Sequence, residues 1–360
     1  MDAGARWPGG QGGIAQRAVG APLPPERRIG VAESLERLLE VAQQAARAGA
    51  QVLRAGEGRQ RVATKTSFAD VVSEADRLSE RAIRQVIAEA CPGHLVLAEE
   101  SDDPELRARL AQDPASVEHL WLVDPLDGTA NYVHGVPLFA VSVAYLRAGR
   151  LQVGVVHDAS RDLTFSAVHG RGAALNGRPI RVSERARLRE SLLATGFQYD
   201  REAGVRLNLP QFAALQLQAR GVRALGSAAL GLAFVAAGWL EGFWELRLMP
   251  WDVAAGILLV QEAGGAVTRV DGSPYGWHAP DVLASNGRVH EELVRQLVEA
   301  SRRGWGVLAA AAPGGDASGG AGKAGARAPA AAAPSRSATE PLPLEAPGGT
   351  GTKGPDRTPL

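Results

Sequence analysis

Two aspartates stand where a strand-like apolar run comes to an end. The segment Trp121–Tyr132 reads Trp-Leu-Val-Asp-Pro-Leu-Asp-Gly-Thr-Ala-Asn-Tyr, and Pro125 favours the first central position of a turn that begins at Asp124. Such a turn can direct the carboxylates of Asp124 and Asp127 to one side, and it leaves the carbonyl of Leu126 free of a strand ladder. The same pattern is also typical of an acidic turn followed by a helix cap.

Gly128 and Thr129 follow the second aspartate directly. They offer successive backbone amides and one hydroxyl, and donors of this kind suit the oxygens of a phosphate group. The segment therefore combines acidic groups with a cradle for a phosphate oxygen.

Two further acidic features widen this pattern. Glu99 and Glu100 follow another strand-like run, and Asp252 stands at the start of a helical pattern. Taken singly, the glutamates are typical of a solvated loop, and Asp252 of a helix cap or a partner of the helix dipole. If Glu99, Asp252 and the two aspartates of the turn met in one pocket, their charges would repel strongly unless cations lay between them. A metal site is the hypothesis that resolves this repulsion.

The expected metal follows from the ligand atoms. All of them are oxygens, including the Leu126 carbonyl, and oxygen ligands favour Mg²⁺ or Mn²⁺ over zinc. The 7 histidines form no i, i+4 pair, and the single cysteine, Cys91, excludes an internal disulfide, which fits a reducing cytoplasm. Neither a Walker A motif nor an intact G-x-G-x-x-G is present, so a kinase or dinucleotide-binding interpretation has little support.

An alternation of helices and strands must position these groups. Apolar residues recur at helical spacing over 35–53, and Ser73 can cap a second helix whose buried stripe covers 78–90. Short apolar runs between turns predict strands. Strands are expected over 95–97, 120–123, 140–146, 151–156, 163–168, 242–246 and 266–270, and further helices over 207–220, 227–237 and 251–263. Because both halves contain both kinds of element, the predicted class is α/β or α+β with layered sheets.

The two ends of the chain differ from its middle. Gly and Pro dominate residues 1–30, and Ala, Gly, Pro and Ser dominate 304–360. Such segments bury too little apolar surface to offset a chain entropy of about 1–2 kcal/mol per residue, so both are predicted to be disordered. The C-terminal tail is either a passive extension or a partner-binding segment. Residues 31–303 form the predicted globular unit.

The charge balance excludes some partners. The 39 basic and 39 acidic residues give a formal net charge of zero, which argues against general nucleic-acid binding. No apolar run reaches the roughly 18 residues that a membrane span needs. The first residues lack the apolar core of a secretory signal. We therefore expect a soluble, cytoplasmic protein with no membrane partner and no direct nucleic-acid partner.

Taken together, these motifs resemble the inositol monophosphatase family of Mg²⁺-dependent, lithium-sensitive phosphatases. The resemblance covers essentially Val31–Arg302. It rests on Lys65 with Asp70-Val-Val-Ser-x-x-Asp76, Ala98-Glu-Glu-Ser101, Asp124-Pro-Leu-Asp-Gly-Thr129, Leu175-Asn-Gly177, Gly226-Ser-Ala-Ala-Leu230, Phe243-Trp-Glu245 and Pro250-Trp-Asp-x-Ala-Ala-Gly256. It implies a layered α-β-α-β-α sandwich, the fold of inositol monophosphatases and related sugar phosphatases.

The resemblance also implies metal ligands. Glu99, Asp124 and the Leu126 carbonyl resemble the ligands of a first Mg²⁺, while Asp124, Asp127 and Asp252 resemble those of a second. Asp124 would bridge the two ions. Glu99 would also help to hold a third, weaker ion, and Mn²⁺ is the expected substitute.

Further roles follow from the same resemblance. Asp76 and Thr129 resemble the pair that orients and activates the attacking water, although Ser73-x-x-Asp76 is also a capping-box pattern. The backbone around Gly128 and Thr129 would bind the phosphate. The residues that resemble substrate contacts are Ala228, Arg223 and Glu245.

The implied activity is hydrolysis of a phosphomonoester by metal-activated water, with myo-inositol 1-phosphate as the leading substrate. The partner would be a small phosphorylated polyol or sugar, and a homodimer is expected by analogy. The metal motifs do not separate this activity from phosphatases of fructose 1,6-bisphosphate, histidinol phosphate, NADP or 3′-phosphoadenosine 5′-phosphate. A non-catalytic interaction role of the intact fold is a further alternative.

Overall fold

The computed structural model describes residues 34–56, 62–64, 71–101, 103–197, 208–276 and 279–304, with the backbone alone for 62–64 and 71–73. All of them lie within one compact unit of the chain. The segments 1–30 and 305–360, which we predict to be disordered, lie outside the described residues, as do Lys65 and Asp70 of the sequence motifs.

The larger sheet has 7 strands in the order β3-β4-β5-β6-β7-β8-β9. Only β3 and β4 pair in parallel, and every other neighbouring pair of this sheet is antiparallel. The strands are β3 (Leu95–Ala98), β4 (His119–Asp127), β5 (Ala140–Arg147), β6 (Arg150–Asp158), β7 (Leu163–Val168), β8 (Gly172–Leu175) and β9 (Arg178–Ile180). The first five confirm the strands predicted from apolar runs.

The second sheet has 5 strands in the order β11-β10-β12-β14-β13. Strand β10 pairs in parallel with β11 and with β12, and the other two pairs are antiparallel. The strands are β10 (Leu192–Thr195), β11 (Gly221–Ala224), β12 (Gly242–Leu246), β13 (Ala266–Thr268) and β14 (Asp281–Ser285). A separate hairpin joins β1 (Val62–Thr64) to β2 (Val71–Ser73).

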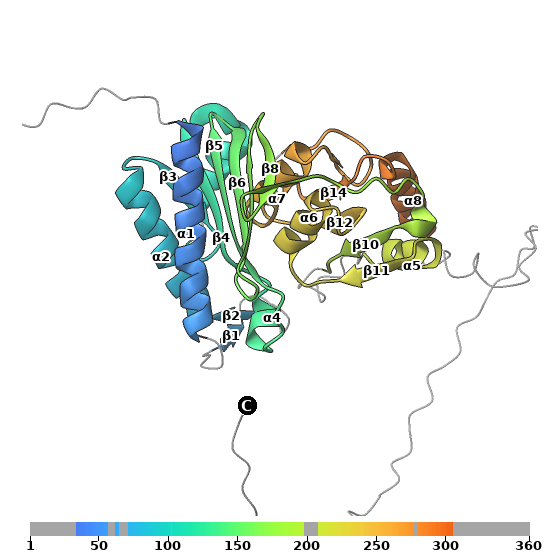
Figure 1. Cartoon of the computed structure of the whole chain (residues 1–360), viewed down its shortest axis with the longest axis horizontal. Coiled ribbons are helices and arrows are strands. Elements are labelled where there is room, and N and C mark those ends of the chain that lie inside the picture. Colours follow the sequence, from blue (N-terminus) through green and yellow to red (C-terminus); the bar gives the residue numbers. More distant parts are fainter. Residues whose placement is uncertain are drawn as a thin grey trace, which may run out of the picture. The chain divides into compact units, whose positions relative to one another are not determined.

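Helices cover both faces of each sheet (Figure 1). The helices are α1 (Leu35–Gly56), α2 (Glu74–Ala90), α3 (Pro104–Gln112), α4 (Thr129–Val133), α5 (Leu209–Gln218), α6 (Ala228–Ala236), α7 (Pro250–Glu262) and α8 (His290–Arg303), with short 3₁₀ turns η1 (Pro114–Ser116) and η2 (Leu188–Glu190). The helices α1 and α2 pack on one face of the larger sheet, α6 and α7 lie between the two sheets, and α5 and α8 pack on the outer face of the smaller sheet. The layers therefore run α-β-α-β-α, and the predicted fold class is confirmed.

Strand β5 shows how the sequence produces these layers. Its side chains alternate between the two faces, as the period of a strand requires. Val141, Val143 and Tyr145 join the apolar cluster with α1 and α2. Ala144 and Leu146 join the cluster with α6 and α7. Both faces are covered, so the strand reads as a continuous apolar run instead of an alternating pattern.

One glycine allows the middle helices to lie close to the larger sheet. A Cβ atom added to Gly154 of β6 would lie 2.7 Å from the carbonyl oxygen of Ala255 in α7. Real Cβ atoms essentially never come this close to a backbone atom, so β6 or α7 would have to move. The layer that carries Asp252 therefore depends on this contact.

We predict that Gly154→Ala lowers the free energy of unfolding by about 1–3 kcal/mol, the usual cost of overpacking a core. The matched control is Gly221→Ala in strand β11, because a Cβ there meets chiefly the tip of the flexible Arg223 side chain at 3.0 Å. Urea unfolding followed by circular dichroism would measure both variants. Equal stability of the two would show that the close approach of β6 and α7 is not a constraint.

Candidate active site

The carboxylates that the sequence singled out converge at the end of the parallel pair β3–β4. The two strands are in register, with Ala98 opposite Val123, so the residues that follow them emerge side by side. The amide of Glu99 donates a hydrogen bond of 3.2 Å to the carbonyl of Val123. Glu99 therefore lies next to Asp124, although the two are 25 positions apart in the sequence.

A bulge in β4 separates the two aspartates of the turn. Asp124 pairs with Ser142 of β5, but Asp127 pairs with Ala140. Over this stretch β4 therefore contains one residue more than β5. A bulge bends a strand and re-aims its side chains. The turn is fixed from inside by a 2.9 Å hydrogen bond that the amide of Leu126 donates to Asp124 Oδ1. The predicted acidic turn is thus a bulged end of a buried strand.

Asp127 lies against the N-terminus of α6. Its carboxylate accepts hydrogen bonds from the amides of Ala228 (3.2 Å) and Ala229 (2.8 Å) and from the hydroxyl of Ser227, the N-cap residue of α6. Helix N-termini favour negative charge. Burial raises the pKa of Asp127 to about 6, while the hydrogen bonds from Ser227 and these amides oppose that rise.

Asp252 is held in the first turn of α7. Its Oδ2 accepts a 2.8 Å hydrogen bond from the amide of Met249, the residue before the helix. Burial and the charge of Glu99 raise the pKa of Asp252 well above its ordinary value, and the hydrogen bond from Met249 opposes this. Asp252 therefore caps α7, as the helix-cap interpretation predicted. It also lies close enough to Glu99 for the charge of Glu99 to raise its pKa.

Asp124 lies at the centre of the group. Its side chain is buried, and its pKa is raised well above the ordinary value by burial first and then by the charges of Glu99, Asp127 and Asp252. The structure thus brings together all four carboxylates that the sequence grouped. In the described part of the chain, however, no three Asp, Glu, His or Cys side chains are placed closely enough to hold one ion as they stand. The carboxylates of Asp124, Asp127 and Asp252 accept hydrogen bonds from backbone amides instead.

Asp76 and Thr129 meet across the site. Thr129 Oγ1 lies 3.1 Å from Asp76 Oδ1 on α2 and 3.0 Å from the carbonyl oxygen of Leu126. One hydroxyl carries one hydrogen, so Thr129 donates to one of these acceptors at a time. Asp76 is fully buried in the first turn of its helix.

Three of the expected phosphate and substrate residues, Gly128, Ala228 and Glu245, lie around this centre. Gly128 adopts a left-handed conformation with φ 93°, and a Cβ there would lie 2.9 Å from the carbonyl of Leu138. Burial, together with the charge of Asp127, raises the pKa of Glu245 to about 8. The amide of Ala228 is engaged by Asp127, and Arg223 is exposed on β11.

Two residues that received no role from the sequence hold the site together. Asn131 of α4 donates through Nδ2 to the carbonyls of Leu138 (2.7 Å) and Leu225 (2.8 Å). It therefore ties the loop before Ser227 to the loop before β5. Ser227 caps α6 and also donates to Asp127. The sequence could have indicated the cap, because a serine stands before an apolar helical run. It could not have indicated the role of Asn131, whose partners are 7 and 94 residues away.

Comparison with known proteins identifies the class. A sequence model of the inositol monophosphatase family matches residues 34–302. A Synechocystis protein named inositol-1-monophosphatase is 42% identical over 264 residues, covering 73% of this chain and 89% of the relative. A Pseudomonas aeruginosa protein named Nus factor SuhB is 41% identical over 267 residues, covering 73% of this chain and 96% of the relative. The solved inositol monophosphatase of Anabaena (Nostoc) sp. matches with a TM-score of 0.64 and 40% identity over 74% of this chain and 96% of that one.

The chain therefore belongs to the inositol monophosphatase family, and it is a phosphatase. Catalysis in this family depends on metal ions, and the substrate is a small phosphorylated molecule. No helix in the described ranges is both long and apolar enough to cross a membrane.

We predict that Asn131→Ala lowers kcat about 10- to 100-fold, the usual effect of removing a group that orients ligating residues. The loop at Leu225 would lose its anchor, and Ser227 would no longer be held against Asp127. Steady-state hydrolysis of a phosphomonoester would measure the loss.

The matched control for this variant is Asn286→Ala. Asn286 also donates through Nδ2 to two partners, Ser183 (3.0 Å) and Arg185 (2.8 Å), but it touches none of the grouped carboxylates. Both variants should lose stability, and only Asn131→Ala should lose activity per folded molecule. Equal activity of the two folded variants would contradict the positioning role.

Proposed function

We propose that this chain is a Mg²⁺-dependent phosphomonoesterase whose principal substrate is myo-inositol 1-phosphate. The observation that supports metal dependence most directly is Asp124, whose pKa is raised well above its ordinary value by burial first and then by three neighbouring carboxylates. Several buried negative charges in one place are costly unless they are protonated or neutralised by cations. A hydrolase of dianionic phosphate esters needs positive charge at the same position.

The donor set fits a hard divalent cation. It consists of carboxylates and one backbone carbonyl, and among the described residues it includes neither His nor Cys, which favours Mg²⁺ with Mn²⁺ as a substitute. In our proposal Glu99, Asp124 and the Leu126 carbonyl hold a first ion, and Asp124, Asp127 and Asp252 hold a second. Glu99 also contributes to a weaker third position. Bound there, the ions would lower the pKa of water and offset charge on the phosphate and the leaving oxygen.

The chain itself supplies orientation and proton transfer. The Asp76 carboxylate accepts from Thr129, which leaves the lone pairs of Thr129 Oγ1 available to accept a hydrogen bond from water. A water held in this way points its oxygen at the phosphorus, and Asp76 can receive the proton through Thr129. The amides of Gly128 and Thr129 bind the remaining phosphate oxygens in the proposed complex. No covalent enzyme intermediate is required.

Recognition of the alcohol part of the substrate is assigned to the other side of the site. In our proposal Glu245 contacts the substrate hydroxyls, with Arg223 and Ala228 on the same rim. Burial, together with the charge of Asp127, raises the pKa of Glu245 to about 8, and cations beside Asp127 would favour the carboxylate as an acceptor for substrate hydroxyls. The proposal also includes a homodimer, a cytoplasmic location and inhibition by lithium, each from the family resemblance alone.

We predict that Asp124→Asn lowers kcat at least about 10³-fold, because several kcal/mol of charge stabilisation would be lost. The substitution keeps the size of the side chain and the acceptor for the Leu126 amide. It also removes a buried charge that its neighbours oppose, so the melting temperature without Mg²⁺ should rise. Phosphate release and differential scanning fluorimetry would measure the two effects.

The control for this variant is Asp113→Asn. Asp113 is exposed, caps η1 and lies outside the grouped carboxylates. The Asp113→Asn variant should keep normal activity and normal stabilisation by Mg²⁺. Wild-type activity in Asp124→Asn would disprove the ligand assignment.

Measuring kcat/KM for a panel of phosphomonoesters would separate myo-inositol 1-phosphate from the alternative substrates. We expect the highest value for myo-inositol 1-phosphate among fructose 1,6-bisphosphate, histidinol phosphate, NADP and 3′-phosphoadenosine 5′-phosphate. A tenfold preference for any other member would reassign the substrate within the same mechanism.

An interaction role is the second candidate function, because one relative at 41% identity is named Nus factor SuhB. Such a role would use the folded surface and survive the loss of metal ligands. Co-purification with wild type and with Asp124→Asn separates the two candidates. Partners retained by both proteins would favour an interaction role in addition to catalysis.

A further inference from the structure

A polar cavity of about 470 Å³ lies between α1 and the turns that follow β6 and β8. Its lining residues are Arg47, Gln51, Arg54, Asp162, Thr164 and Asn176. The three from α1 follow each other at steps of four and three residues, so they share one helix face. None of the six is among the proposed ligands or substrate contacts. The cavity is therefore a second polar site on the molecule.

A buried histidine lies beside this cavity with one nitrogen unpaired. The side chain of His157 is fully buried, and its Nδ1 lies 2.9 Å from Thr164 Oγ1. Its Nε2 has no hydrogen-bond partner within the part of the chain that the structure describes. The nearest charged atom given for it is Asp162 Oδ1 at 3.5 Å, beyond normal hydrogen-bond distance. Buried polar atoms are rarely left unpaired, and the two residues next to this ring, Thr164 and Asp162, both line the cavity.

The charge around the cavity is positive on balance. Arg54 donates to the carbonyl of Ala159 at 3.1 Å and lies 3.7 Å from Asp162. The side chain of Asp162 is 79% exposed, so solvent screens its charge. Arg47 makes no hydrogen bond or ion pair with the described residues. Its charge contributes to lowering the pKa of His157. Two guanidinium groups therefore face one solvated carboxylate.

The protonation of His157 limits what its Nε2 can offer a partner. Burial first, then the charges of Arg54 and Arg47, lower its pKa to about 4, although Asp162 and Asp158 oppose this. The imidazole is therefore neutral at pH 7. If the Thr164 hydroxyl donates to Nδ1, Nε2 carries the ring hydrogen and must be a donor. A donor next to two guanidinium groups suits an acceptor with negative charge.

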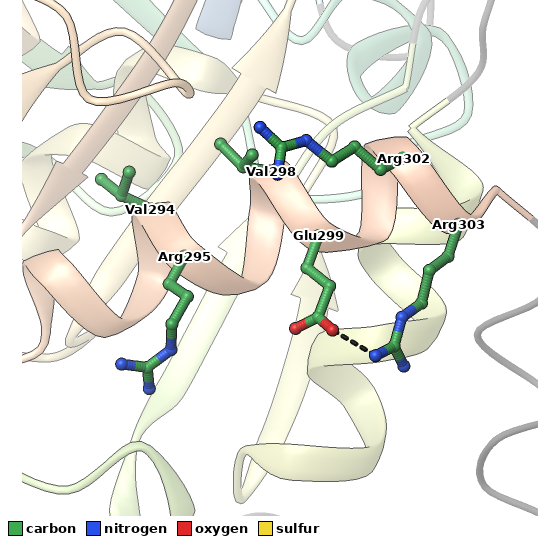
Figure 2. Close-up of a pocket in the computed structure, with 6 residues that line it drawn as sticks. All are labelled: Val294, Arg295, Val298, Glu299, Arg302 and Arg303. Atoms are coloured by element: carbon green, nitrogen blue, oxygen red, sulfur yellow. Dashed lines mark hydrogen bonds and ion pairs between the residues drawn. The ribbon is translucent and has the colours of Figure 1, made fainter. Parts of the chain in front are cut away.

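A hollow on α8 offers a contrast. It measures about 510 Å³ and is lined by Val294, Arg295, Val298, Glu299, Arg302 and Arg303, all on one helix. Figure 2 shows Arg303 reaching toward Glu299, with which it forms an ion pair. No buried unpaired side-chain atom lies among these six residues. This hollow has three arginines and one glutamate, but it lacks the buried donor that distinguishes the cavity at α1.

We propose that the cavity at α1 binds a small oxyanion, with Arg47 and Arg54 contributing guanidinium donors and His157 contributing Nε2–H. Phosphate and phosphomonoesters share this chemistry, and the site is independent of the proposed catalytic centre. Gln51 lies on the same helix face between the two arginines and adds an amide donor. The proposal holds whether or not myo-inositol 1-phosphate is the substrate.

The test follows the imidazole signals of His157 by NMR in protein labelled at histidine, with EDTA present and inorganic phosphate as the probe. We expect a saturable shift of the His157 signals and a rise of its pKa from about 4, because a bound anion favours the protonated ring. Glycerol phosphate in a second titration separates a site for the free ion from one for phosphomonoesters. The Asp124→Asn protein should respond like wild type, so failure of the catalytic proposal would not affect this result.

The decisive variant is Arg47→Gln, which should weaken phosphate binding at least about tenfold through loss of a charge-assisted contact. Its matched control is Arg37→Gln, because Arg37 is also exposed on α1 but pairs with Glu40 at 3.2 Å away from the cavity. Normal binding by Arg37→Gln is expected. Unchanged His157 signals at saturating phosphate, or equal affinity in Arg47→Gln and wild type, would overturn the proposal.

Discussion

The mutual repulsion of buried carboxylates is the constraint on which this structure depends. Asp124 is buried at the end of β4, where Glu99, Asp127 and Asp252 all oppose its ionisation. Asp124 and Asp127 belong to β4, Glu99 follows β3 and Asp252 lies in α7, so the charge can be gathered only because these three elements are themselves fixed. The close approach of β6 and α7 at Gly154 is one such support. The site is therefore a property of the layers as well as of the motif.

Helix ends partly compensate the concentrated charge. Asp127 accepts two amides and a hydroxyl at the start of α6, and Asp252 accepts an amide at the start of α7. These donors fix the positions of both side chains and offset part of their negative charge. Metal dependence, which the family membership establishes, then follows from the chemistry of the residues as well as from similarity.

Much of the larger sheet could be predicted from the sequence, because continuous apolar runs mark strands that are covered on both faces. The order of the second sheet could not, since β10 pairs with β11 and β12 through residues that lie far apart in the chain. The same limit applies within the site. Charge and turn chemistry raised the grouping of Glu99, Asp124, Asp127 and Asp252 as a hypothesis, and the family resemblance supplied it. The hydrogen bond from Asn131 to Leu225 depends on a contact between distant segments. Ala228 was expected as a substrate contact, but its amide donates to Asp127, which depends on where α6 begins.

Anomalous scattering from crystals grown with Mn²⁺ would locate bound ions relative to the carboxylates. We expect anomalous peaks in contact with the carboxylate of Asp124, with Glu99 on one side and Asp127 and Asp252 on the other. Crystals of protein that is active with Mn²⁺ but shows no peak at Asp124 would contradict the ligand assignment.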